Sequence, residues 1–175
     1  MDIVKMAKQL GFDDAAVIDV KEIRFESEFR MYCEQNLCGK YGANYTCPPH
    51  CGSEREMRQK VLQHANALVL RSLHQGVKYS DNAAVRGAQV KHNNDMLTLV
   101  KELKNGGFAP LMAGASDCTL CEKCLRNEGI ACPHEQERFS CMSAYCIDVA
   151  ALAQTCKIDY AYNEGELSLF GMICY

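Results

Sequence analysis

The sequence of 175 residues has little net charge, no long apolar run and no glycine-rich phosphate-binding motif. The formal net charge is −3 and the basic residues form no block, so we expect no nucleic-acid-binding surface. No apolar stretch is long enough to span a membrane. Because neither G-x-G-x-x-G nor a Walker-type loop occurs, nucleotide binding has no support. A hydrophobic content of 48% with 23% charged residues excludes a disordered or collagen-like chain.

The N-terminal residues lack the features of a targeting segment. Residues 1–8 contain no signal-peptide-like apolar run, and the acidic Asp2 does not suit a transit peptide. We therefore expect a cytoplasmic protein with reduced thiols. In that compartment, cysteine-dense segments usually bind metal or perform redox chemistry. A secreted disulfide scaffold is the less favoured alternative, because such scaffolds are usually shorter than this chain.

Periodic apolar patterns indicate the scaffold. Apolar residues at helical spacing predict helices over 3–10, from 53 onward, over 85–103 and over 148–156. Apolar runs predict strands over 15–20, 67–73 and 108–112, and a terminal hairpin formed by 158–162 and 167–173. We expect one α+β domain over residues 1–175, with a mixed sheet of about five strands, packed helices and two cysteine-rich metal-binding loops.

The feature in excess is cysteine, with 12 residues in two tight groups and a scatter. None occurs between residues 52 and 117, so the cysteine-rich loops are expected at 33–51 and 118–146. Three of the 4 prolines lie directly within these groups, where they stiffen the chain. Such stiffening reduces the entropy that is lost when thiolates converge on a ligand.

The second cysteine group carries the strongest functional signal. Cys118, Cys121 and Cys124 form C-x2-C-x2-C, and Cys132-Pro133 follows after seven intervening residues. Cysteines at steps of three supply thiolates to one side of a four-iron cluster, and bacterial ferredoxins have the same opening and Cys-Pro ending. In two-cluster ferredoxins the fourth cysteine ligates the other cluster, so Cys132 is a candidate for either site. Zinc is the alternative, although a tetrahedral zinc site typically takes two separate C-x2-C pairs.

The first cysteine group is less stereotyped. Cys33, Cys38, Cys47 and Cys51 follow C-x4-C-x8-C-x3-C, with glycines and prolines between them. This composition suits a loop that wraps around a bulky ligand. A second cluster or a zinc ion is favoured, and a set of buried, non-ligating thiols is the alternative. Cys51 is the weakest candidate of the four. An exchange in which Cys132 joins this group also stays open.

The other cysteines and the histidine of the long helix have simpler interpretations. Cys156 and Cys174 lie in apolar segments, where free cysteine packs well in a core. Cys141 and Cys146 adjoin the second group and are candidates for a redox pair. His92 lies on the apolar stripe of the long helix, so we expect a buried, hydrogen-bonded histidine.

Three segments resemble a family of cysteine-rich predicted metal-binding proteins that is common in anaerobic bacteria and archaea. Residues 38–49 are similar to its C-x2-Y-G…C-P-P element, and residues 118–132 resemble its C-x2-C-x2-C…C element. Residues 142–149 are similar to a segment ending Gly-Ile-Asp-Val, except that Cys146 replaces the glycine and Ser143 stands where glutamate is expected. The resemblance implies metal binding through the cysteine loops. A fainter likeness is to iron–sulfur reductases of epoxyqueuosine or organohalides, which use a corrinoid.

These patterns predict an iron–sulfur protein with one or two 4Fe–4S clusters and an electron-transfer or redox role. Such a role implies a redox partner protein. One alternative is a zinc-binding structural or interaction module, in which the metal supplies folding energy. The other is a reductase that couples a cluster to a corrinoid or flavin. No convincing nucleophile–base pair can be assembled, so no catalytic residue is assigned.

Overall fold

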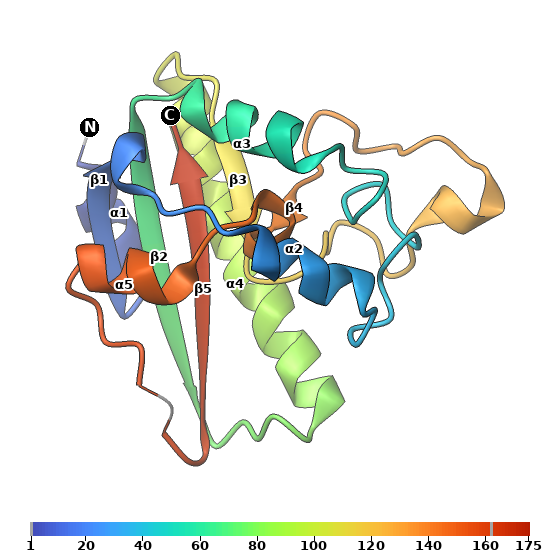
Figure 1. Cartoon of the computed structure of the whole chain (residues 1–175). Coiled ribbons are helices and arrows are strands. Elements are labelled where there is room, and N and C mark those ends of the chain that lie inside the picture. The colour runs from blue at the N-terminus through green and yellow to red at the C-terminus, as the bar shows by residue number, and fades with distance from the viewer. Residues whose placement is uncertain (1, 162) are drawn as a thin grey trace.

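The computed structural model describes residues 2–161 and 163–175 and has a mixed sheet with helices on both faces (Figure 1). The strand order is β1-β2-β5-β3-β4, and every neighbouring pair is antiparallel except β3 with β4. The predicted α+β fold with about five strands is therefore confirmed. The strands are β1 (Asp14–Asp19), β2 (Asn66–Gln75), β3 (Leu111–Gly114), β4 (Ser140–Cys141) and β5 (Glu166–Cys174).

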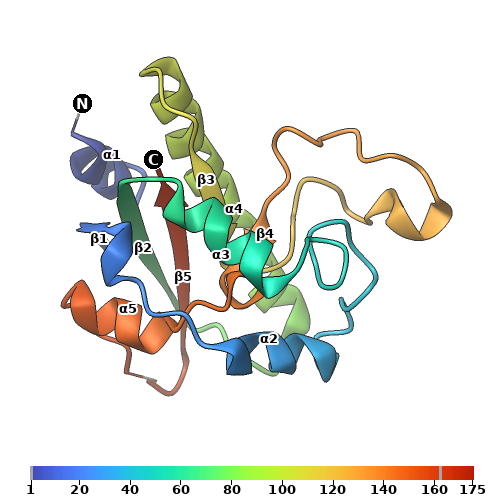
Figure 2. The ribbon, with the colours of Figure 1, turned by 45° about the horizontal axis from the view of Figure 1, so that its top comes forward.

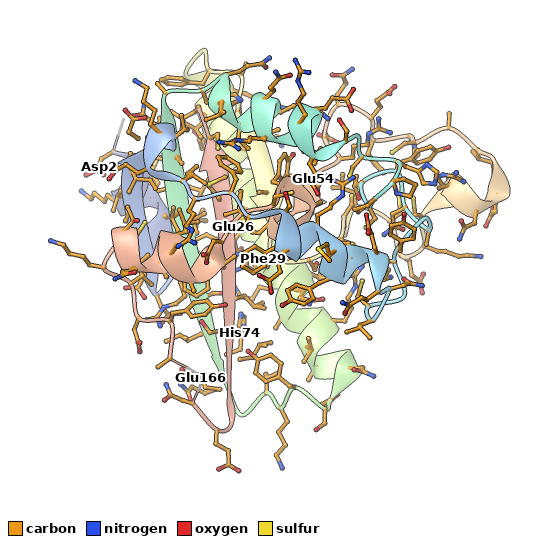
Figure 3. All side chains as sticks on the ribbon, viewed as in Figure 1. Asp2, Glu26, Phe29, Glu54, His74 and Glu166 are labelled. Carbon is orange, nitrogen blue, oxygen red and sulfur yellow. The ribbon has the colours of Figure 1, made fainter. Side chains whose placement is uncertain are left out.

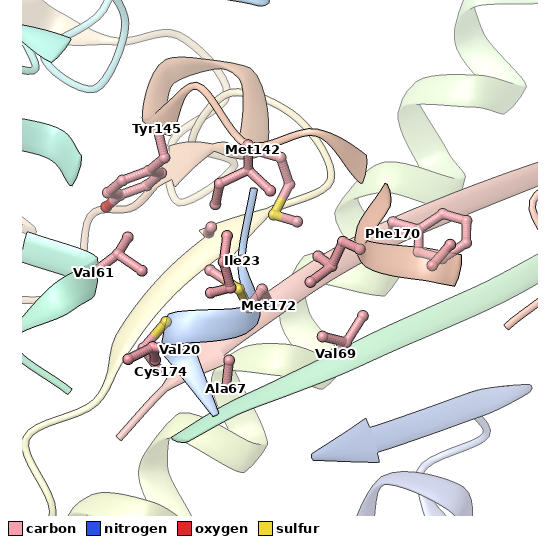
Figure 4. Close-up of a cluster of buried hydrophobic side chains, with 14 of the residues drawn as sticks. Val20, Ile23, Val61, Ala67, Val69, Met142, Tyr145, Phe170, Met172 and Cys174 are labelled. Carbon is pink, nitrogen blue, oxygen red and sulfur yellow. The ribbon is translucent and has the colours of Figure 1, made fainter. Parts of the chain in front are cut away.

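The interior strand β2 is buried on both faces. Ala67 and Val69 pack into the core on one side of the sheet, whereas Leu68 and Leu70 pack into the core on the other. Successive side chains of a strand point to opposite faces, so a strand covered on both sides reads as a continuous apolar run. Figure 4 shows the first of these cores, where Val20 and Ile23 lie beside Met172 of β5.

Two sets of helices supply the covers. The α1 helix (Ile3–Gln9) and the long α4 helix (Asn82–Asn105) cover the face that contains Leu68. The α3 helix (Glu54–Leu62), the α5 helix (Val149–Thr155) and the short turns η1 (Val20–Glu22) and η3 (Met142–Tyr145) cover the other. No helix within the described residues is long and apolar enough to cross a membrane.

Local signals account for several helix boundaries. Ser53 and Glu56 form a capping box that begins α3, as their spacing predicts. Asp148 accepts a hydrogen bond from the Ala151 backbone amide and begins α5. The predicted helix over 85–103 is α4, which begins one turn earlier because the Asp81 carboxylate caps it.

The predicted terminal hairpin is wrong. Residues 158–161 form no strand, and Tyr162 lies outside the described residues. The β5 strand instead pairs along its whole length with β2, which lies far earlier in the chain, and at Met172–Cys174 with β3. Ile158 instead packs into the first core directly after α5. Strand β3 also begins later than expected, after Pro110, which has no backbone N–H for a sheet ladder.

The α2 helix (Ser27–Glu34) was not predicted, and it leads into the first cysteine loop. It packs against η3, and the Ser27 hydroxyl donates a hydrogen bond to the Glu54 carboxylate at the start of α3. Figure 3 labels Phe29 of α2 and Glu54 of α3. Both cysteine-rich loops extend to the same side of the sheet, where they lie beside each other (Figure 2). The Tyr45 hydroxyl of one loop donates to the Ile130 carbonyl of the other over 2.8 Å.

Candidate metal centres

The second cysteine group gathers around one cavity. The chain leaves β3, makes the short η2 turn (Leu125–Glu128) and reverses at Gly129, whose φ of 69° suits glycine. The reversal brings the fourth cysteine back to the first three. A cavity of about 180 Å³ is lined by all four predicted ligands, Cys118, Cys121, Cys124 and Cys132. Cys132 thus lies with its own group.

The root of this loop is fixed by a buried amide of α4. Asn93, which is fully buried, accepts a hydrogen bond from the Ala115 amide over 3.1 Å and donates to the Ser116 hydroxyl over 3.2 Å. Gly114 lies against this contact, because an added Cβ would be 2.8 Å from the Asn93 Oδ1 atom. The helix therefore holds the chain in one path just before Cys118.

Cys118 is also the most constrained thiol of this group. Burial raises the pKa of Cys118, whereas hydrogen bonds from the backbone of Leu120 and Phe139 lower it. Backbone donors of this kind stabilise a thiolate, and a bound metal offsets the remaining desolvation. His134 lines the same cavity as the four thiols, and its Nδ1 atom lies 3.7 Å from the Glu137 carboxylate.

The first cysteine group is only partly gathered. A cavity of about 600 Å³ is lined by Cys33, Cys38, Cys47 and, in place of the predicted Cys51, Cys141. Cys33 lies in the last turn of α2, Cys38 and Cys47 lie in the loop that follows, and Cys141 ends β4. Sequence reasoning missed Cys141 because only the pairing of β3 with β4 brings it to the first loop.

Two thiols of this cavity, Cys47 and Cys141, are costly to ionise. A side-chain hydrogen bond with Cys33 raises the pKa of Cys141, and burial raises it further. Burial raises the pKa of Cys47 to about 12. Because thiolates are disfavoured in such surroundings, they require a nearby cation, and a bound metal supplies one directly.

Cys51 and Cys146 lie elsewhere. The Cys51 thiol points to the Gly52 carbonyl at 3.8 Å and packs against the first core. Cys146 is buried beside a separate cavity near Phe25. Cys141 and Cys146, the candidates for a redox pair, therefore line different cavities, and the thiol that interacts with Cys141 is Cys33.

An ion-pair cluster separates the two cavities. The Asp117 carboxylate accepts hydrogen bonds from the Asn44 amide over 3.0 Å and from the Arg86 guanidinium over 2.8 Å, and it lies 3.5 Å from the Lys40 ammonium. Asp117, Arg86 and Lys40 line both cavities. The two cysteine groups are therefore neighbours with one polar wall between them.

A buried guanidinium supports the first loop from the opposite side. Arg30 donates one hydrogen bond to the Ala144 carbonyl over 2.9 Å and another to the Gly52 carbonyl. No carboxylate within the described residues forms an ion pair with it. Its charge lowers the pKa of both Cys33 and Cys51, although other effects on those thiols are larger.

The donor chemistry suits soft metals. Each cavity is lined by four cysteines, and thiolate ligands favour zinc or iron–sulfur clusters over magnesium or calcium. Among the described residues, no three cysteine, histidine, aspartate or glutamate side chains form a group that would hold a single metal ion.

A family model of predicted metal-binding proteins, DUF2284, matches residues 16–175. The chain belongs to the DUF2284 family. The match covers both cysteine loops of this DUF2284 protein and every helix and strand except α1 and the first two residues of β1. Comparisons with curated proteins and with solved structures find no match.

The structure shows why glycine is expected at one position where this DUF2284 chain departs from the family-like segment. Cys146 stands where glycine is expected and has a φ of 60°, a left-handed conformation that glycine adopts without strain. Ser143, which stands where glutamate is expected, lines the cavity of the first loop. Both departures therefore fall on the turn that follows Cys141.

Proposed function

We propose that this protein is an iron–sulfur protein that holds a 4Fe–4S cluster on the second loop and uses it for electron transfer. The observation that supports the proposal is the single cavity lined by Cys118, Cys121, Cys124 and Cys132. Their sequence spacing is that of a ferredoxin-like ligand run, in which steps of three match the separate irons of a cubane.

The surroundings of this cavity suit an anionic group. A cluster with four thiolate ligands is negatively charged, and the cavity lining offers four cationic side chains against the two carboxylates of Asp117 and Glu122. The cations are Lys40, Arg86, Lys123 and Arg138. A bound cluster supplies one-electron chemistry, and the protein tunes its potential through burial and hydrogen bonds to sulfur. The Leu120 and Phe139 backbone donors at Cys118 are such hydrogen bonds.

The proposal includes a reducing cytoplasm and a redox partner protein. All twelve cysteines are free thiols, which fits a compartment that keeps thiols reduced. An electron carrier with one centre near its surface needs a donor and an acceptor, so the partner follows from the function.

Anaerobic purification with iron, sulfide and zinc analysis tests the proposal. We expect brown protein with about four iron and four sulfide per cluster. Its visible absorption should bleach on reduction, and the reduced cluster should give an electron paramagnetic resonance signal. Cys121→Ala should remove this cluster, and Cys156→Ala is the matched control because Cys156 packs near the first core. Colourless protein with zinc would instead identify the metal-stabilised interaction module. A corrinoid or flavin spectrum in the same preparation would indicate the reductase.

A further inference from the structure

Three distant parts of the chain place four thiols around the larger cavity. The end of α2 supplies Cys33, the following loop supplies Cys38 and Cys47, and β4 supplies Cys141. We infer that these four cysteines form a second metal centre, a four-thiolate site for an iron–sulfur cluster, and that Cys51 is not a ligand. The inference adds a centre to the proposed function, and its ligand set can be tested separately from the first centre.

Strand pairing places Cys141 in this site. The β4 strand is parallel to β3, with Ser140 opposite Ala113 and Cys141 opposite Gly114. Neighbouring side chains of a strand point in opposite directions. Ser140 is buried, whereas Cys141 lines the cavity together with Cys33.

Local bonding keeps Cys51 out of the site. Its amide donates to the Cys47 carbonyl over 3.1 Å, which closes a short turn after Cys47. Its thiol lies beside the Gly52 carbonyl, and Arg30 holds that carbonyl from the other side. Cys51 packs against the core and does not line the cavity. Cys51 is thus close to Cys47 in sequence, as C-x3-C, but its sulfur does not line the cavity that Cys47 lines.

The shape and charge of the cavity favour a metal over a simple disulfide. A bridge between Cys33 and Cys141 would use two thiols and leave Cys38 and Cys47 without a partner. A 2.7 Å hydrogen bond from the Gly42 amide to the Pro48 carbonyl closes residues 42–48 into a compact turn, and Cys38 and Cys47 line the same cavity. Lys40 and Arg86 line the cavity together with the Asp117 carboxylate that pairs with both, so the charged lining has an excess of one positive charge and offsets part of the charge of four thiolates.

The second centre would be the immediate neighbour of the first. Asp117, Arg86 and Lys40 line both cavities, so this cluster of charged side chains lies between them. Two paramagnetic clusters in neighbouring cavities interact magnetically. The pair also provides a route by which one electron passes from one loop to the other.

Cysteine variants and metal analysis of the whole chain test the inference. Wild-type protein should contain about eight iron atoms per chain, and Cys141→Ala should fall toward about four. Cys51→Ala is the matched control and should keep the wild-type iron content. Cys38→Ala should reproduce the loss, and because Cys38 is exposed, this variant tests the ligand set even if Cys141→Ala folds poorly. Magnetic coupling between two reduced clusters should disappear in both ligand variants.

Three results would overturn the inference. They are full iron content in Cys141→Ala, an equal loss in Cys51→Ala, and wild-type protein with about four iron and a Cys33–Cys141 disulfide detected by mass spectrometry. In the last case, loss of that iron in Cys121→Ala would leave the proposed function standing. Wild-type protein without iron but with about two zinc would overturn both clusters.

Discussion

Asn44 and Asp117 join the two cysteine-rich loops through a single hydrogen bond of 3.0 Å. The same amide nitrogen of Asn44 lies 3.6 Å from the Cys47 sulfur. Asp117 directly precedes Cys118, so one contact connects a thiol of the first cavity with the backbone of the second. The two candidate centres are therefore mechanically linked.

Replacing Asp117 should weaken both centres. Asp117→Ala removes the acceptor of the Asn44 and Arg86 hydrogen bonds, and we expect a loss of about 1–3 kcal/mol in the free energy of unfolding. Metal release to a chelator should also accelerate from both loops. Asp95→Ala is the control, because Asp95 forms only a surface pair with Lys91 on α4. Release from one loop alone would contradict the proposed linkage.

Replacing Asn93 should affect the second centre more than the first. Asn93→Ala leaves the Ala115 amide without its partner, and an unsatisfied buried donor costs about 1–3 kcal/mol. The expected result is reduced metal content at the second loop and a lower melting temperature. Asn94→Ala is the control on the same helix, because Asn94 is exposed. Unchanged metal content in Asn93→Ala would show that the cysteines alone fix the loop.

Protonation of His92 should destabilise the fold in acid. Burial lowers the pKa of His92 to about 3, and the charges of His74 and Lys91 act in the same direction. The unfolded chain binds this proton below about pH 6.5, so stability is present above that pH and is lost as the pH falls toward 3. Between pH 7 and pH 5 the expected loss is about 2 kcal/mol.

Urea unfolding at these two pH values measures the effect of His92. The His92→Gln variant should show a smaller loss of stability between pH 7 and pH 5, because it removes the titrating group. The comparison should use metal-free protein in both cases, so that acid release of metal does not contribute. Equal pH dependence in wild type and variant would rule out His92 as the source.

Replacing Arg30 should loosen the junction between α2, the first loop and η3. Arg30→Met keeps the apolar length of the side chain but removes the donors to the Ala144 and Gly52 carbonyls, at an expected cost of about 2–4 kcal/mol. Thermal unfolding measures this change. Arg24→Met is the control, because Arg24 is exposed and its replacement should leave the melting temperature nearly unchanged. A similar melting temperature for both variants would contradict the role of Arg30.

Local patterns predict the scaffold well. The apolar run around Leu68, the stripe that includes Met96 and the capping box at Ser53 each specify one element through short-range chemistry. The prediction of a terminal hairpin failed for a non-local reason, since β5 pairs along its whole length with β2, a strand distant in the sequence. The α2 helix was missed because it lies at the start of a cysteine-rich segment and has few buried apolar residues.

The same contrast applies to the candidate metal centres. The second loop supplies its four thiols from one short segment, so their spacing is enough to predict that they lie together. The first cavity takes Cys141 from a strand far along the chain, and no local spacing connects Cys141 with Cys33. Cys51 illustrates the opposite error, because nearness to Cys47 in sequence did not place both sulfurs in one cavity.

The parallel pairing of β3 with β4 has a consequence for how the molecule assembles. A parallel pair needs a crossover connection, which is usually a helix with its own buried face. Here residues 115–139 make the crossover, and they contain no helix longer than the η2 turn. Only a few crossover residues, such as Phe139 and Leu120, pack against the core, and a metal ligated by this crossover would add a second anchor. We therefore expect the second loop to be loaded first and the edge strand that carries Cys141 to dock afterwards.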